Sequence, residues 1–156
     1  MALGSNLGDR AATLDAAVAR LSETAGVMDV RVSRYHETVA EGMAEADAPP
    51  FLNAAAVMRC SLPPEELLAC LLRIERELGR VRPASAQDPA GRLSRTLDLD
   101  LVLYGSAVLT GPGLVVPHPR MHLRRFVLEP LAEVGGGLVH PIFGVTVSEL
   151  LRKLAG

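Results

Sequence analysis

The sequence predicts an α+β sandwich, in which helices pack on one face of a mainly antiparallel sheet. Three observations support this fold class. The chain contains two strand-then-helix units, a pair of strand-like segments that looks antiparallel, and helical segments whose apolar residues recur every three or four positions. Helices segregated to one side of an antiparallel sheet are a common way for such elements to bury their apolar faces.

The first strand-then-helix unit lies at the N-terminus. Residues 1–3 predict a short strand, and Asp9 is placed to cap a helix whose apolar positions continue to Leu21. Residues 27–35 then alternate between apolar and polar side chains, as a half-buried strand does. Residues 36–50 are rich in glycine, alanine, proline and acidic side chains, and this composition predicts a long loop.

The second unit begins with residues 51–60, which predict a strand that pairs with an earlier one. Ser61 is the expected N-cap of the helix that follows, whose first turn is expected to contain Pro63, Pro64 and two glutamates. The helix is expected to continue to about Leu78, because Gly79 is a typical residue at a helix end.

The C-terminal part predicts a strand that ends at Tyr104, a short strand at residues 107–109, and a last helix at residues 146–154. Between them, residues 126–134 predict a helix that Pro130 interrupts. This order of elements is typical of a ferredoxin-like α/β sandwich.

Two loops, residues 36–50 and 80–95, are longer than is usual inside a compact domain. Loops of more than about 12 to 15 residues are uncommon unless they are functional or disordered. We therefore expect functional residues in these loops or next to them.

Composition narrows the classes of function. With 156 residues, of which 49% are hydrophobic, the chain is expected to form a single domain over residues 1–156. The net charge is -2 and no long block of like charges occurs, so neither nucleic acid nor a membrane surface is an expected partner. No signal peptide or spanning segment is indicated, and the two cysteines form no C-x-x-C motif. We expect a monomer in a reducing cytoplasm.

Two aspartates stand in a strand that is otherwise largely apolar. Residues i and i+2 of a strand point to the same side, so Asp98 and Asp100 share one face while the leucines between and beside them share the other. Two close carboxylates repel each other unless a cation lies between them, and oxygen ligands of this kind suit Mg²⁺. The alternative is an edge strand that presents two ordinary aspartates to solvent.

Basic residues flank this pair in the sequence. They are Arg80, Arg82, Arg92 and Arg95 before it, and Arg120, Arg124 and Arg125 after it, with His118 and His122 nearby. Guanidinium groups bind phosphate oxygens in pairs, so this set would suit a polyphosphate and its Mg²⁺. A surface with many salt bridges would give the same pattern.

Several familiar catalytic motifs do not occur. The segment Gly4-Ser-Asn-Leu-Gly-Asp9 has neither the spacing nor the lysine of a phosphate-binding loop, and a tight turn followed by a helix cap explains it. The chain also has no G-x-G-x-x-G, no H-E-x-x-H and no G-x-S-x-G. These absences argue against dinucleotide-binding, zinc-protease and serine-hydrolase functions.

Four segments together resemble 6-hydroxymethyl-7,8-dihydropterin pyrophosphokinase, a family of folate biosynthesis. They are ALGSNLGDR at 2–10, FLNA at 51–54, RTLDLDLVLYG at 95–105 and PHPRMHLRRFVL at 117–128. The resemblance implies a ferredoxin-like fold and transfer of the terminal diphosphate of ATP to the hydroxymethyl group of the pterin, with release of AMP. It also implies two Mg²⁺ ions, held by Asp98 and Asp100.

The resemblance assigns further residues to ATP. Six residues match family positions that contact ATP or catalyse the transfer, and a seventh, Leu101, matches a position that lines the nucleotide pocket. The six are Arg80, Arg82, Arg95, Glu75, His118 and Arg124. Of these, Arg80 and Arg95 are expected to act in catalysis together with the two aspartates. The first two arginines match a flexible loop, and Arg95 matches an arginine that grips phosphate.

For the pterin, Phe51 and Phe126 match the aromatic residues that stack on the two faces of the ring, Asn53 matches a residue that hydrogen-bonds its edge, and Thr38 matches a loop contact. Two other hypotheses remain open. One is a degenerate member that binds pterin or nucleotide without transfer, suggested by the unusual lead from Gly91 to Arg95. The other is a ferredoxin-like module that binds a small molecule and has no transferase activity.

Overall fold

An antiparallel sheet lies at the centre of the computed structural model, which describes residues 1–39, 50–79 and 97–156. The strand order is β2-β4-β1-β5, with β3 also paired to β4, and every pairing is antiparallel. The strands are β1 (Ala2–Ser5), β2 (Val27–Val32), β3 (His36–Thr38), β4 (Phe51–Cys60) and β5 (Asp98–Asp100). This is the α+β, ferredoxin-like arrangement that the sequence predicted.

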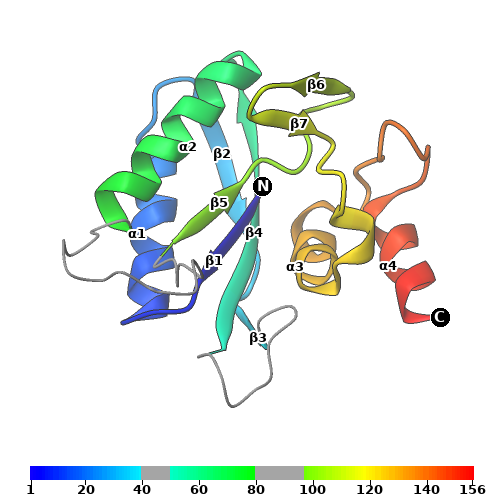
Figure 1. Ribbon diagram of the computed structural model, residues 1–156, viewed down its shortest axis with the longest axis horizontal. Coiled ribbons are helices and arrows are strands. Elements are labelled where there is room, and N and C mark those ends of the chain that lie inside the picture. Colours follow the sequence, from blue (N-terminus) through cyan, green and yellow to red (C-terminus); the bar gives the residue numbers. More distant parts are fainter. Residues whose placement is uncertain (40–49, 80–96) are drawn as a thin grey trace.

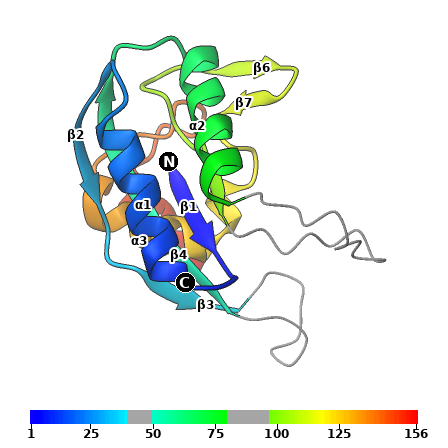
Figure 2. The same ribbon diagram turned by 90° about the vertical axis from the view of Figure 1, so that its left-hand side faces the viewer.

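Helices cover both faces of this sheet, not one face as expected (Figure 1). Helices α1 and α2 lie next to each other on one face (Figure 2), whereas α3 lies on the other face with α4 packed against it (Figure 1). Their bounds are α1 (Arg10–Ser22), α2 (Pro64–Leu78), α3 (Arg125–Gly135) and α4 (Val147–Ala155).

The residues of β4 explain the two-sided burial. Ala54 and Ala56 pack into the core under α1 and α2, while Ala55, between them, packs with Leu128 of α3. A continuous buried run of this kind is typical of a strand covered on both faces, and the small alanine side chains let both helix layers approach. The expectation of a single covered face was wrong, because successive alanines of this run are buried in cores on opposite faces of the sheet.

Local signals placed the first two helices with one error. Asp9 caps α1 as predicted, its Oδ1 accepting a hydrogen bond from the Ala12 N–H at 3.1 Å. Helix α2 ends at Gly79 as predicted, but its N-cap is Pro63, and Ser61 instead donates from Oγ to the carbonyl of Gly26 at 3.4 Å. The adjacent prolines account for the shift, because proline fits the first helical position and constrains the residue before it.

The chain after residue 97 departs further from expectation. Strand β5 ends at Asp100 rather than Tyr104, and the short strand expected at 107–109 is β6 (Leu109–Gly111), paired in a hairpin with β7 (Leu114–Val116). Pro130 lies inside α3 without interrupting it and is fully buried. Burial of its ring offsets the backbone hydrogen bond that proline cannot donate.

Two more expectations concern the loops and the last helix. The loop predicted at 36–50 begins with a strand, β3, and its residues 40–49 lie outside the described part of the chain. Helix α4 begins where predicted, because the side chains of Thr146 and Glu149 each accept a hydrogen bond from the other's backbone N–H. None of the helices in residues 1–39, 50–79 and 97–156 is long and apolar enough to cross a membrane.

His140, in the loop before α4, gives a pH-dependent contribution to stability. It is buried, and its Nδ1 accepts hydrogen bonds from the backbone N–H groups of Ile142 and Phe143, each at 3.2 Å. Burial, and secondly the charge of His122, lower the pKa of His140 from its ordinary 6.5. The unfolded chain therefore takes up a proton at a pH where the folded chain does not, so the free energy of unfolding falls as pH decreases through this interval.

We expect the variant His140→Asn to lose this pH dependence, since an asparagine oxygen can accept the same backbone hydrogen bonds but does not titrate. Chemical denaturation between about pH 7.5 and pH 5 measures the effect as the difference between the two proteins. The wild type should lose more stability than His140→Asn on acidification. Parallel pH profiles would show that His140 titrates normally in the folded protein.

Candidate active site

A pocket of about 320 Å³ opens on the sheet face that carries α3. It is formed by β1, β3, β4, β5 and the start of α3. The residues that line it are Ala2, Leu3, Gly4, Thr38, Val39, Phe51, Asn53, Asp98, Asp100, Arg124, Phe126 and Val127. Seven of them are residues that the sequence assigned to pterin, ATP or metal, from four separate segments of the chain.

Strand register explains why these distant residues meet. Gly4 of β1 pairs with Asn53 of β4 on one side and with Asp98 of β5 on the other, and Asn53 pairs in turn with His36 of β3. Paired residues of an antiparallel sheet point to the same face. One transverse row of the sheet therefore carries Asn53 and Asp98 on either side of a glycine.

The next pairs along the strands extend this surface in both directions. Thr38 pairs with Phe51 across β3 and β4, and Ala2 of β1 pairs with Asp100 of β5. The floor of the pocket between the polar residues is thus made of Gly4 and Ala2. Sequence reasoning did not assign either residue to the site, although a glycine inside a strand often marks the close approach of a ligand.

The aspartates of β5 face as predicted. Leu97, Leu99 and Leu101 are buried in the core under α1 and α2, while Asp98 and Asp100 are half-buried on the pocket side. The core packing of the leucines fixes the strand, and the i, i+2 spacing then fixes the common direction of the carboxylates. Their role as metal ligands stays a prediction.

The aromatic residues and their polar neighbours form the other end of the pocket. Phe51 of β4 and Phe126 of α3 both line it, and the guanidinium carbon of Arg124 lies 5.5 Å from the centroid of the Phe126 ring. Asn53 is buried and donates a hydrogen bond from Nδ2 to Oγ1 of Thr38. All four residues assigned to the pterin are therefore brought together.

His118 lies beside the pocket rather than in its lining. Its backbone N–H donates to the carbonyl of Val102 at 2.9 Å, and its Nδ1 accepts from the Arg120 N–H at 3.1 Å. Burial lowers the pKa of His118, and the charges of Arg124 and Arg120 lower it further, whereas Asp98 acts in the opposite direction. The ring is therefore neutral at pH 7, and because Nδ1 accepts, Nε2 carries the proton and can donate.

The remaining predicted residues lie elsewhere. Glu75 of α2 is buried on the opposite face of the sheet from the pocket, and Leu101 is buried in the same core. Arg80, Arg82 and Arg95 lie outside the described residues. The structure thus does not bring Glu75 or Leu101 into the pocket lining, and the roles of all five residues stay predictions.

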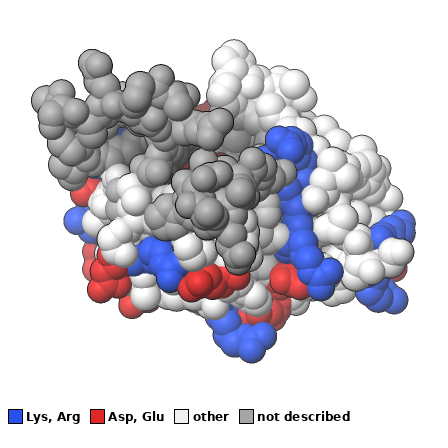
Figure 3. Space-filling model, turned by 60° about the horizontal axis from the view of Figure 1, so that its bottom comes forward, with Lys and Arg blue, Asp and Glu red and all other residues white. Residues whose placement is uncertain are grey.

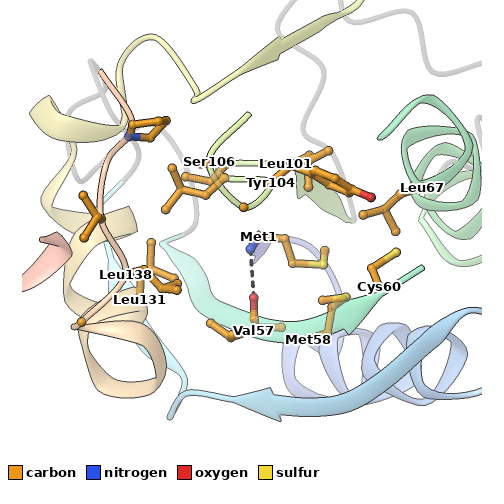
Figure 4. A pocket seen from close by; sticks show the side chains of 17 residues that line it. Met1, Val57, Met58, Cys60, Leu67, Leu101, Tyr104, Ser106, Leu131 and Leu138 are labelled. Carbon is orange, nitrogen blue, oxygen red and sulfur yellow. Dashed lines mark hydrogen bonds between the residues drawn. The ribbon is translucent and has the colours of Figure 1, made fainter. Parts of the chain in front are cut away.

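Leu101 instead lines a second, larger cavity of about 600 Å³ at the start of β1 (Figure 4). There the amino group of Met1 donates to the carbonyl of Ala56 at 2.9 Å, and burial lowers its pKa to about 6. The side chains around this cavity, such as Leu67 and Met58, are almost all apolar, and none of those in its lining is acidic or basic. The smaller pocket therefore has the better chemistry for a charged substrate.

On the face of the molecule shown in Figure 3, acidic and basic side chains are interspersed, without a broad area of one sign among the described residues. Within that same part of the chain, no group of three or more histidine, cysteine, aspartate and glutamate side chains could hold a metal ion. A metal at Asp98 and Asp100 would need further oxygen ligands from water or substrate, and this is the usual coordination of Mg²⁺ at nucleotide sites. The two carboxylates therefore fit Mg²⁺ better than zinc.

Comparison with known proteins agrees with these features. A family model described as 7,8-dihydro-6-hydroxymethylpterin-pyrophosphokinase (HPPK) matches residues 1–136. The chain is 39% identical over 152 residues to a 2-amino-4-hydroxy-6-hydroxymethyldihydropteridine pyrophosphokinase of Synechocystis, covering 97% of this chain and 73% of that protein. It is 44% identical over 134 residues to the Bacillus subtilis protein of the same name, covering 86% and 75%.

Longer relatives contain the same region. The chain is 37% identical over 154 residues to the folic acid synthesis protein fol1 of Pneumocystis carinii, covering 99% of this chain but only 20% of that protein. A crystal structure of HPPK-DHPS in complex with substrates superimposes with a TM-score of 0.66 at 13% identity, over 97% of this chain and 42% of the other, and supports the fold alone. On the family match and the bacterial relatives, the chain belongs to the 7,8-dihydro-6-hydroxymethylpterin-pyrophosphokinase family.

Proposed function

We propose that this protein transfers the terminal diphosphate of ATP to the hydroxymethyl group of 6-hydroxymethyl-7,8-dihydropterin, releasing AMP, in tetrahydrofolate biosynthesis. The observation that carries the proposal is one pocket with two ends, an aromatic end at Phe51 and Phe126 and a carboxylate end at Asp98 and Asp100. The family and the names of the bacterial relatives favour this transfer over a binding module without activity. The proposal includes ATP and the pterin as the substrates of a cytoplasmic monomer.

The aromatic end has the chemistry to bind a flat heterocycle. Phenylalanine rings stack on planar rings, and the amide of Asn53 offers hydrogen bonds to a ring edge that carries both donors and acceptors. Because Thr38 accepts from Nδ2 of Asn53, the amide group is held in one orientation. This fixed polar edge between aromatic side chains would position the hydroxymethyl group toward β5.

The carboxylate end has the chemistry to bind a triphosphate with its cations. Asp98 and Asp100 would hold two Mg²⁺ ions, which when bound neutralise the triphosphate and polarise the phosphoryl group under attack. Arg124 lines the same pocket and supplies a positive charge that stabilises negative charge developing on phosphate oxygens. Arg80, Arg82 and Arg95 are also proposed to bind phosphate. These three residues lie outside the described part of the chain.

His118 adds an uncharged hydrogen-bond donor to the carboxylates and arginines proposed to bind the triphosphate. Its Nε2–H can donate a hydrogen bond to a phosphate or leaving oxygen without adding a proton to it, because the pKa of the ring is lowered. The pterin hydroxyl oxygen forms a bond to the β-phosphorus, the bond from that phosphorus to the bridging oxygen that leaves with AMP breaks, and the hydroxyl proton is released to solvent. The side chains named here position and stabilise charge, and none of them forms a covalent intermediate.

The decisive experiment is an assay with ATP, Mg²⁺ and 6-hydroxymethyl-7,8-dihydropterin, followed by chromatography of the products. We expect AMP and the pterin diphosphate in equal amounts, and neither product when Mg²⁺ is chelated. Formation of ADP instead would indicate transfer of a single phosphoryl group. Binding of both substrates by calorimetry without AMP would favour the degenerate member, and absence of binding would reject the proposal altogether.

A further inference from the structure

One carboxylate on α3, remote from the pocket lining, holds the short strand β3. Glu133 accepts hydrogen bonds from the backbone N–H of Arg34 at 2.9 Å and from the Arg34 guanidinium at 3.3 Å. It also contacts Nε2 of His36 at 2.5 Å. The backbone hydrogen bond is the main reason that the pKa of Glu133 lies below its ordinary value. One charged group thus joins α3 to His36, the first residue of β3, and to Arg34, two residues before it.

These two elements, α3 and β3, both contribute residues to the lining of the pocket. Phe126 precedes Glu133 by seven residues, which is about two turns of α3, so both side chains lie on the same side of the helix. His36 precedes Thr38 by two residues on β3, so these side chains also share a face. The contact between Glu133 and His36 therefore joins the faces of α3 and β3 that also carry Phe126 and Thr38.

Within the described part of the chain, β3 has few other interactions to keep it in place. It is three residues long, and among the described strands it pairs with β4 alone, through His36, Glu37 and Thr38. On the opposite face, Arg10 of α1 bonds Glu37 at 3.0 Å and the carbonyl of Pro50 at 2.8 Å. That interaction holds the strand to α1 but does not determine how far it lies from α3.

We propose that Glu133 is a positioning residue that sets the width of the pterin end of the pocket, by fixing β3 against α3. This inference rests on the proposed function, because it assigns the pocket to the pterin. Without the contact, Thr38 and the Asn53 amide that it orients would move relative to Phe126. The pterin ring could then not stack on Phe126 and hydrogen-bond to Asn53 at the same time.

The test compares Glu133→Ala with Glu129→Ala. Glu129 lies on the same helix and forms an ion pair with Arg125 at 2.6 Å, so its loss removes a surface carboxylate without touching β3. In Glu133→Ala we expect KM for the pterin to rise about tenfold, with KM for ATP and kcat changed less than about threefold. Glu129→Ala should leave all three constants near wild type, and Glu133→Gln, which keeps an acceptor for the Arg34 N–H, should lie between.

A double-mutant cycle with His36→Ala covers the case in which one variant folds poorly. If the two side chains act through their contact, the double variant should bind pterin no more weakly than the worse single variant. The inference would be overturned if Glu133→Ala bound pterin as tightly as the wild type and differed only in a lower melting temperature. Glu133 would then only stabilise the fold. Absence of pterin binding by the wild type would instead overturn the proposed function, and the inference with it.

Discussion

Replacement of either Asp98 or Asp100 by asparagine is expected to lower kcat/KM by about a thousandfold or more, which corresponds to about 4 kcal/mol of transition-state stabilisation. Both carboxylates are on the pocket side of β5, where they are the acidic side chains in the lining. Asparagine keeps the shape of each side chain but removes the charge that a divalent cation requires. Steady-state kinetics at saturating Mg²⁺ measure the loss.

The same variants should fold normally. The leucines that anchor β5 point to the other face, where they pack in the core under α1 and α2, and neither substitution touches them. Melting temperatures without Mg²⁺ should therefore stay within about 5 °C of that of the wild type. Mg²⁺ with a non-hydrolysable ATP analogue should raise the melting temperature of the wild type, and less so in either variant.

Asp29→Asn is the matched control for these substitutions. Asp29 is exposed on β2, pairs with Arg59 at 3.5 Å, and has a positive φ of 55°, a conformation that asparagine tolerates well. Activity close to wild type is expected. If Asp98→Asn or Asp100→Asn also kept near wild-type turnover, that carboxylate would not be a ligand of a catalytic metal.

Features that depend on a few neighbouring residues could be predicted from the sequence. The cap at Asp9, the end of α2 at Gly79 and the start of α4 near Thr146 each depend only on residues within one turn. The common face of Asp98 and Asp100 follows in the same way from the two-residue period of a strand. The family followed from four such segments, and the comparisons confirm it.

Features that depend on packing were harder to predict. The sequence of β4 allows burial on one face or on two, and only the positions of α3 and α4 decide between them. Pro130 breaks a helix by its local chemistry, yet here burial keeps it within α3. Glu133 gave no signal at all, because its partners Arg34 and His36 lie almost a hundred residues away in the chain.

Gly4 shows why the floor of the pocket could not be found from the sequence. As part of Gly4-Ser-Asn-Leu-Gly-Asp9 it was explained by a turn, but it lies in β1, between Asn53 and Asp98. A Cβ atom at this position would lie 3.1 Å from Oδ1 of Asn53 and 3.7 Å from Cδ1 of Phe51. The glycine therefore leaves open the space between the polar edge and the aromatic wall.

We expect Gly4→Val to lower pterin affinity by about a hundredfold while leaving the fold intact. Valine is favoured in strands, and Gly4 is not among the described glycines with positive φ, so the backbone accepts the side chain. The added methyl groups would occupy space needed by the ring. Asn53 cannot yield without straining its hydrogen bond to Thr38. Gly4→Ala, which adds only the Cβ atom, should have a smaller effect.

Gly111→Val is the control for this prediction, since Gly111 lies in the exposed strand β6 and a Cβ there would meet no atom within 4 Å. Calorimetric titration with the pterin, in the presence of Mg²⁺ and an ATP analogue, gives the affinities, and thermal melts monitor folding. Gly111→Val should bind pterin as the wild type does. If Gly4→Val also bound it unchanged, the ring would have to lie elsewhere. If Gly4→Val unfolded, its loss of binding would reflect stability, and Gly4→Ala would then decide whether this floor faces the pterin.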